Sequence, residues 1–205
     1  MRKIMCFIGN QSFVSKNMMQ SLYLYSRDNN CELDADFVIV TVNDEYRERF
    51  LIDEDKTKPY GITSEKKTYD NIPFLQIELS VKHYNIVEKA ENLLEDIKKE
   101  MGAGPEDKLF FIMDHNAFYR TDNLLLKENK CPVSVMLHEN IIQQHKCVLC
   151  TSCYYDVMSK TKWRDIYLSF FKNSKIPAMF EREQLYMSYF HVKTAKEIID
   201  VFLEE

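Results

Sequence analysis

Short, uninterrupted apolar runs recur along the chain, and each one ends at polar or turn-forming residues. The clearest are residues 3–8, 36–42 and 108–113. Continuous apolar runs of this length are typical of strands buried on both faces of a parallel sheet. Residues 74–79 alternate between apolar and polar types and predict a strand with one more exposed face, and residues 132–137 predict a further strand. The sequence therefore predicts five strands.

Segments with helical periodicity lie between these runs. The longest is residues 81–101, where apolar side chains recur every three or four positions. Ser80 is a predicted N-cap for this helix, and Gly102 with the glycine and proline that follow predicts its end. Other helices are expected at 12–28, 45–51, 116–126 and near the C-terminus, around 185–202.

Strands that alternate with amphipathic helices imply crossover connections and a mostly parallel sheet covered on both faces. We therefore predict an α/β protein, a Rossmann-like three-layer domain over residues 1–140. The polar segment 53–70 predicts a loop. Residues 141–205 are richer in cysteine and aromatic side chains, and they predict a mainly helical C-terminal extension packed on the domain.

Composition excludes several common classes of protein. The chain has four glycines and contains neither the Walker A pattern nor Gly-x-Gly-x-x-Gly, both of which need glycine where the backbone approaches a phosphate. A net charge of −5 argues against nonspecific coating of DNA. No apolar run approaches the roughly 18 residues of a membrane span, and no secretory signal is recognisable. We expect a cytoplasmic protein with no membrane association.

Polar residues follow the first predicted strand directly. These are Asn10, Gln11 and Ser12, and a helix is expected to begin beside them. Ligands of parallel sheets bind beyond the carboxyl ends of the strands, and helix N-termini present unpaired N–H groups with a partial positive charge. The three side chains therefore predict a place for a phosphate or a base edge. The alternative is that Asn10 and Ser12 only cap the helix.

The fourth predicted strand ends in a second polar cluster. Asp114, His115 and Asn116 follow the strand, and Arg120 lies about one turn later. Together they offer a carboxylate, an imidazole and an anion-pairing guanidinium, so they are candidate ligand-binding residues, and Asp114 and His115 are candidates for acid–base chemistry. The alternative is a helix capped by Asp114 with His115 exposed.

Three cysteines share a metal-binding spacing. Cys147, Cys150 and Cys153 form Cys-x-x-Cys-x-x-Cys, which suits thiolate binding of Zn²⁺ or an iron–sulfur cluster. On a helix the same three positions lie along one face, and buried structural thiols explain the pattern without a metal.

The order of elements over residues 1–140, with polar tips on the first and fourth strands, resembles the sensor domains of the CRISPR-associated Rossmann fold (CARF) type. In that family the two polar tips hold cyclic oligoadenylate at the two-fold axis of a homodimer. The resemblance implies a ligand bound by Asn10, Gln11, Ser12, Asp114, His115, Asn116 and Arg120.

Three functions are consistent with these patterns. The first is a nucleotide- or cyclic-oligonucleotide-binding sensor that forms a homodimer. The second is a small enzyme dependent on Zn or an iron–sulfur centre, in which Asp114 and His115 act on the substrate. The third is transfer of a sugar from a nucleotide donor. The sequence leaves open whether the protein is an enzyme.

Overall fold

The computed structural model describes ten parts of the chain: residues 1–9, 12–31, 33–43, 60–81, 92–114, 137, 140–141, 143–151, 186–188 and 192–204. Their strands form one seven-stranded sheet in the order β3-β4-β2-β1-β5-β6-β7. The strands are β1 (Lys3–Gly9), β2 (Asp36–Asn43), β3 (Tyr60–Tyr69), β4 (Ile72–Val81), β5 (Lys108–Asp114), β6 (Lys146–Thr151) and β7 (Tyr186–Ser188).

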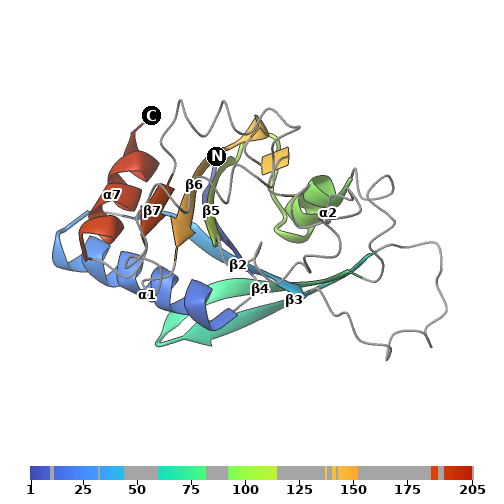
Figure 1. Ribbon diagram of the computed structural model, residues 1–205, viewed down its shortest axis with the longest axis horizontal. Helices are drawn as coiled ribbons and strands as arrows, with labels where there is room; N and C mark the ends of the chain where they lie inside the picture. Colours follow the sequence, from blue (N-terminus) through green and yellow to red (C-terminus); the bar gives the residue numbers. More distant parts are fainter. Residues whose placement is uncertain are drawn as a thin grey trace, which may run out of the picture.

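Helices cover both faces of this sheet (Figure 1). Helices α1 (Ser12–Asp28) and α7 (Val192–Leu203) lie on one face, and α2 (Leu93–Glu100) lies on the other. Two apolar cores result, one between the sheet and α2 and one between the sheet and the pair α1 and α7. The three-layer α/β architecture predicted from the sequence is confirmed.

All neighbouring strands pair in parallel except β3 and β4, which are antiparallel. Counted along the chain without β3, the parallel strands lie in the order 3-2-1-4-5-6. This is the order of doubly wound, dinucleotide-binding Rossmann folds. The mostly parallel Rossmann-like sheet is thus confirmed, with one antiparallel strand added at its edge.

The central strands are buried on both faces, as their continuous apolar runs require. In β1, alternate residues enter different cores: Cys6 packs towards α2, and Phe7 packs towards α1. In β5, Phe111 and Ile112 divide in the same way. Alternation of side chains across a strand explains why an uninterrupted apolar run is needed when both faces are covered.

The described residues after position 140 continue this architecture. Strands β6 and β7 extend the sheet beyond β5, and α7 packs beside α1 (Figure 1). The Phe202 ring of α7 contacts the Phe110 ring of β5 edge-on, with 5.5 Å between ring centroids. The expected C-terminal helix is present, and the described residues of 141–205 also include two strands.

The prediction of a loop over 53–70 is wrong for residues 60–69, which form β3. This strand pairs with β4 along its whole length, from Tyr60 opposite Val81 to Tyr69 opposite Ile72. The two-residue turn between them, Asp70-Asn71, has φ values of 50° and 65°. Positive φ at both positions gives the type I′ turn that matches the twist of a hairpin, so pairing and turn geometry outweigh the polar composition.

The helix expected to start after Ser80 is wrong at Val81, which belongs to β4, and residues 82–91 lie outside the described residues. Ser80 lies inside β4, opposite Gly61 of β3, and cannot cap a helix. Helix α2 begins at Leu93, where Asn92 is the N-cap position without a side-chain hydrogen bond. Its predicted end is confirmed: Gly102 has a φ of 62°, and the N–H groups of Gly102 and Ala103 donate to the carbonyls of Lys99 and Lys98. These bonds form a Schellman motif.

The strand predicted at 132–137 is not the neighbour of β5. Leu137 has helical conformation, and the place beside β5 is taken by β6. The prediction is therefore wrong at Leu137, because short apolar runs carry too little periodicity to separate strand from helix. Residues 132–136 lie outside the described residues. The helices predicted at 45–51 and 116–126 lie outside the described residues.

Candidate functional site

Among the described strands, the order in which strands are added to the sheet reverses at β1. Strand β1 pairs with β2 on one side and with β5 on the other, and later strands extend the sheet outwards from each. In open α/β sheets such a switch point leaves a crevice outside the carboxyl ends of the two central strands. Here those ends are Gly9 of β1 and Asp114 of β5.

Both end positions belong to the face that α1 covers. Gly9 continues the row of Met5 and Phe7 in β1, and Asp114 continues the row of Phe110 and Ile112 in β5. Because alternate positions of a strand share a face, Gly9 and Asp114 occupy the same side of the sheet. Helix α1 begins three residues after Gly9, at Ser12, so its N-terminus lies beside the end of β1.

The N-terminal turn of α1 is electrostatically suited to an anion. It contains no acidic residue. Lys16 follows in the next turn, but its ammonium lies over the Phe74 ring of β4, 5.9 Å from the ring centroid. The unpaired N–H groups of a helix N-terminus carry a partial positive charge, which acidic side chains in the first turn would offset. No acidic side chain of the first turn therefore offsets the attraction of this helix end for a negatively charged group.

A buried polar pair lies on the same face in the neighbouring strands. The Gln76 amide of β4 donates to Thr41 Oγ1 of β2 over 2.9 Å and contacts the Ile39 carbonyl oxygen at 3.4 Å. Gln76 is 3% exposed and Thr41 7%. The expectation that the polar positions of this strand are solvent-facing therefore fails at Gln76 and holds at Glu78, which is exposed.

Sequence reasoning missed this pair because Gln76 is one of the alternating polar positions of its strand, which are expected to face solvent. One signal was available. Thr41 interrupts an otherwise apolar β2, and a lone hydroxyl in a doubly buried strand needs a hydrogen-bond partner. The hydrogen bond joins β2 and β4 on the face of the sheet that α1 covers.

Of the seven ligand-binding residues predicted from the sequence, the structure describes two. It brings Ser12 and Asp114 to the carboxyl edge of the sheet, at the start of α1 and the end of β5. Asn10, Gln11, His115, Asn116 and Arg120 lie outside the described residues.

The cysteine cluster is not a helix face. Cys147 and Cys150 belong to strand β6, where they lie opposite Phe111 and Asp114 of β5. Positions three apart in a strand belong to opposite faces, so the shared-face interpretation of this spacing is wrong for these two residues. Cys147 is 5% exposed in the core on the α2 side. Cys153 lies outside the described residues.

Among the described residues no group of three or more His, Cys, Asp or Glu side chains is arranged to hold a metal ion. Cys6 is fully buried in the core, where desolvation raises its pKa well above the usual value. A thiol with a raised pKa is a poor nucleophile and a poor metal ligand at neutral pH.

These features define the class: a doubly wound α/β protein of Rossmann-like strand order, with its switch point between β1 and β5. No family model and no curated protein matches the chain. Among solved structures, it is similar to one titled "Crystal structure of a probable GTP-binding protein engB". The identity is 8%, the match covers 98% of this chain and 100% of that one, and the TM-score is 0.47.

Of the helices in the described part of the chain, none combines the length and the apolar character needed to cross a membrane.

Proposed function

We propose that the protein binds a nucleotide at the carboxyl edge of its sheet, between the ends of β1 and β5. One observation carries this proposal: the switch point of the strand order, the start of α1 and the position of Asp114 coincide. Each is a usual component of a nucleotide site in open α/β sheets. The absence of a glycine-rich phosphate motif favours a ligand held by side chains and a helix terminus rather than by a phosphate-cradling loop.

The two ends of the proposed site have different chemistry. The start of α1, with Ser12 and no acidic residue in its first turn, suits a phosphate. Asp114 repels a phosphate but can accept hydrogen bonds from ribose hydroxyls or from the N–H groups of a base. The ligand would therefore lie with its phosphate towards β1 and its sugar or base towards β5.

The resemblance to CARF sensor domains supports a finer proposal. In it the ligand is a cyclic oligoadenylate, bound across the two-fold axis of a homodimer. A cyclic oligonucleotide presents several phosphates and bases in a symmetric arrangement, so two copies of the edge formed by Ser12 and Asp114 would match it. The finer proposal requires dimerisation, whereas binding of a mononucleotide does not.

The test is the thermal shift of purified protein with AMP, GTP, cyclic di-AMP, cyclic tetra-adenylate and UDP-glucose, each at saturation. A ligand at about 100 times its Kd stabilises a protein by about 2.7 kcal/mol, which at this length raises Tm by about 5–10 °C. We expect a shift confined to nucleotide ligands. A shift with cyclic tetra-adenylate alone, with dimers in analytical ultracentrifugation, supports the finer proposal.

A pair of variants locates the site. Asp114→Asn should weaken binding at least tenfold while the protein keeps its fold, because it replaces an acceptor-only group with a mixed donor and acceptor. Asp200→Asn is the control, since Asp200 is an exposed residue of α7 that pairs only with Lys196 among the described residues. Equal affinity in both variants, or no response to any nucleotide, contradicts the proposal.

A further inference from the structure

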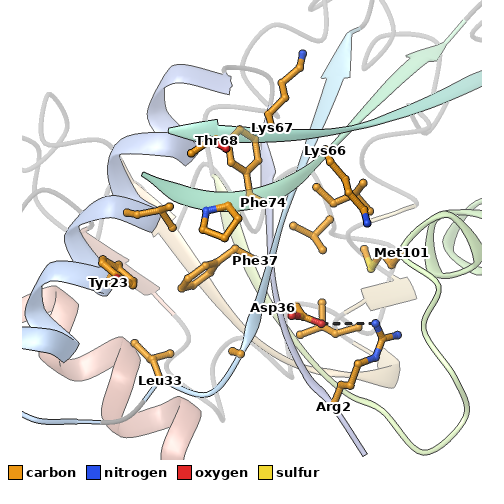
Figure 2. Close-up of a pocket in the computed structure, with 16 residues that line it drawn as sticks. Arg2, Tyr23, Leu33, Asp36, Phe37, Lys66, Lys67, Thr68, Phe74 and Met101 are labelled. Carbon is orange, nitrogen blue, oxygen red and sulfur yellow. Dashed lines mark ion pairs between the residues drawn. The ribbon is translucent and has the colours of Figure 1, made fainter. Parts of the chain in front are cut away.

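A cavity lies at the opposite edge of the sheet, near the amino ends of the parallel strands. It has a volume of about 590 Å³ and opens between β2 and β4 (Figure 2). Pockets for small ligands have volumes of about 300–1,000 Å³ and combine mostly apolar walls with a few polar groups. This cavity shares no lining residue with the edge formed by Ser12 and Asp114.

The cavity exists because two neighbouring strands separate. Pairing of β2 with β4 begins at Val38 opposite Leu75, so Asp36 and Phe37 precede the paired region. Pro73, two residues before Leu75, has no N–H and cannot donate to a neighbouring strand. The amino ends of β2 and β4 therefore diverge, although each keeps its outer partner, β1 or β3.

The two sides of this opening differ in chemistry. On the α1 face the wall is aromatic and aliphatic, with Tyr23, Leu33, Phe37 and Phe74 around it (Figure 2). On the α2 face, Lys66 lies opposite Leu75 across the hairpin and extends towards Met101 (Figure 2). An apolar chamber on the α1 face is thus joined, through the opening between the amino ends of β2 and β4, to a cationic one on the α2 face.

Three cations and one carboxylate line the cavity, but two of the cations are already engaged. Arg2 pairs with Asp36 at 3.5 Å and with Asp107 at 3.0 Å. Lys67 pairs with Glu65 at 3.0 Å, and its amine extends away from the cavity (Figure 2). Lys66 forms no ion pair with any residue that the structure describes, so its single positive charge stays available to a ligand.

We propose that this cavity binds an amphipathic monoanion, a carboxylate on a hydrocarbon or aromatic body. The body lies against Phe37 and Phe74, and the carboxylate pairs with Lys66. A nucleotide is a poorer fit, because its phosphates carry more than one negative charge and no helix N-terminus lies among the described lining residues. The cavity is therefore a second site, whose occupant differs in class from the ligand proposed for the carboxyl edge.

The first experiment is calorimetric titration of the full chain with sodium decanoate, held below its micelle concentration, and with 1-decanol as the uncharged comparison. We expect Lys66→Gln to bind decanoate about three- to tenfold more weakly, since one charge-assisted contact is lost. The same variant should bind decanol as the wild type does, which shows that the apolar chamber is intact. Lys67→Gln is the matched control and should bind both ligands unchanged.

A second readout places the ligand. Met101 lines the cavity, so its methyl resonance in methionine-labelled protein, assigned with Met101→Leu, should move on addition of decanoate. The proposal is overturned if decanoate does not bind, if the Met101 resonance stays fixed, or if Lys66→Gln and Lys67→Gln weaken binding equally. Nucleotide binding at the other edge is measured separately, so either proposal can fail alone.

Discussion

Arg2 and Asp107 join the start of β1 to the residue before β5. The Asp107 carboxylate accepts the Arg2 backbone N–H at 2.8 Å and the Arg2 guanidinium Nη2 at 3.0 Å, and it also accepts the Gly104 N–H at 3.0 Å. Two backbone donors and one guanidinium favour the ionised carboxyl, which lowers the pKa of Asp107 to about 2. The bonds fix the register at the amino ends of the two central strands.

Replacing Asp107 with Asn should lower Tm at pH 7 and leave the fold unchanged. A carboxyl with a lowered pKa stabilises the folded state fully above its unfolded value of 3.8 and loses that effect as pH falls through 2. The difference in Tm between wild type and Asp107→Asn should therefore be constant above about pH 5 and shrink between pH 4 and pH 2. Thermal melts across this range check it.

Asp36→Asn is the control for this prediction. Asp36 pairs with the same arginine, but at 3.5 Å and with 62% of its side chain exposed. Exposed ion pairs contribute little to stability. Asp36→Asn should therefore change Tm much less than Asp107→Asn, and equal changes would show that the Arg2 charge alone, rather than the backbone bonds, matters.

A side chain at Gly102 should destabilise the protein through the backbone conformation alone, without a steric clash. Its φ is 62°, and a Cβ added there would meet no atom within 4 Å. Gly102→Ala should therefore destabilise the protein by about 1–2 kcal/mol, entirely through the left-handed conformation. Gly104→Ala is the matched control, because a Cβ there has only an ordinary contact with Asp107 at 3.8 Å. Urea denaturation of both variants measures the difference.

The central strands could be predicted because the run of apolar residues within each strand is enough to show that the strand is buried. A strand such as Lys3–Gly9 must be apolar on both sides when helices cover both faces, and no other part of the fold is needed to see it. Strand β3 is different. None of its residues is buried: half of them, including Glu65 and Lys66, are exposed and the others are half-buried. Its conformation comes from pairing with β4, which is a tertiary property.

The candidate site was predictable to the same degree. Polar residues at the ends of two strands can be read from the sequence, as at Ser12 and Asp114. That β1 and β5 are neighbours depends on strand order, which the sequence pattern does not contain. The cysteine spacing was misleading because it does not reveal the secondary structure. Cys147 and Cys150 have the sequence spacing of metal ligands, but their positions lie on opposite faces of β6.

The Gln76–Thr41 hydrogen bond can be weighed by a double-mutant cycle. Thr41→Val and Gln76→Leu each remove one partner while keeping volume, and each leaves a buried polar group of the other strand with fewer bonds. Each single change should cost about 1–3 kcal/mol, and the double variant should cost less than their sum by about 0.5–1.5 kcal/mol. Strict additivity in urea denaturation would show that the two residues act independently.

His145 should give the protein a stability that declines in mild acid. Its ring packs against Phe111, with 5.2 Å between centroids, and its Nε2 is buried without a hydrogen-bond partner among the residues that the structure describes. Burial lowers the pKa of His145, and the positive charge of Lys98 lowers it further, against the opposing effect of Glu95. In the folded state the ring therefore resists protonation.

The sign of the effect follows from linkage. Well above pH 6.5 the imidazole is neutral in both states and contributes no pH dependence. As pH falls below 6.5, the unfolded chain takes up the proton first, so the free energy of unfolding decreases. His145→Gln should remove this part of the decline, measured as the difference between the two proteins in urea denaturation at pH 7.5 and pH 5.5. A difference that stays constant, or that reverses sign between these two pH values, would show that the pKa of His145 is not lowered by folding.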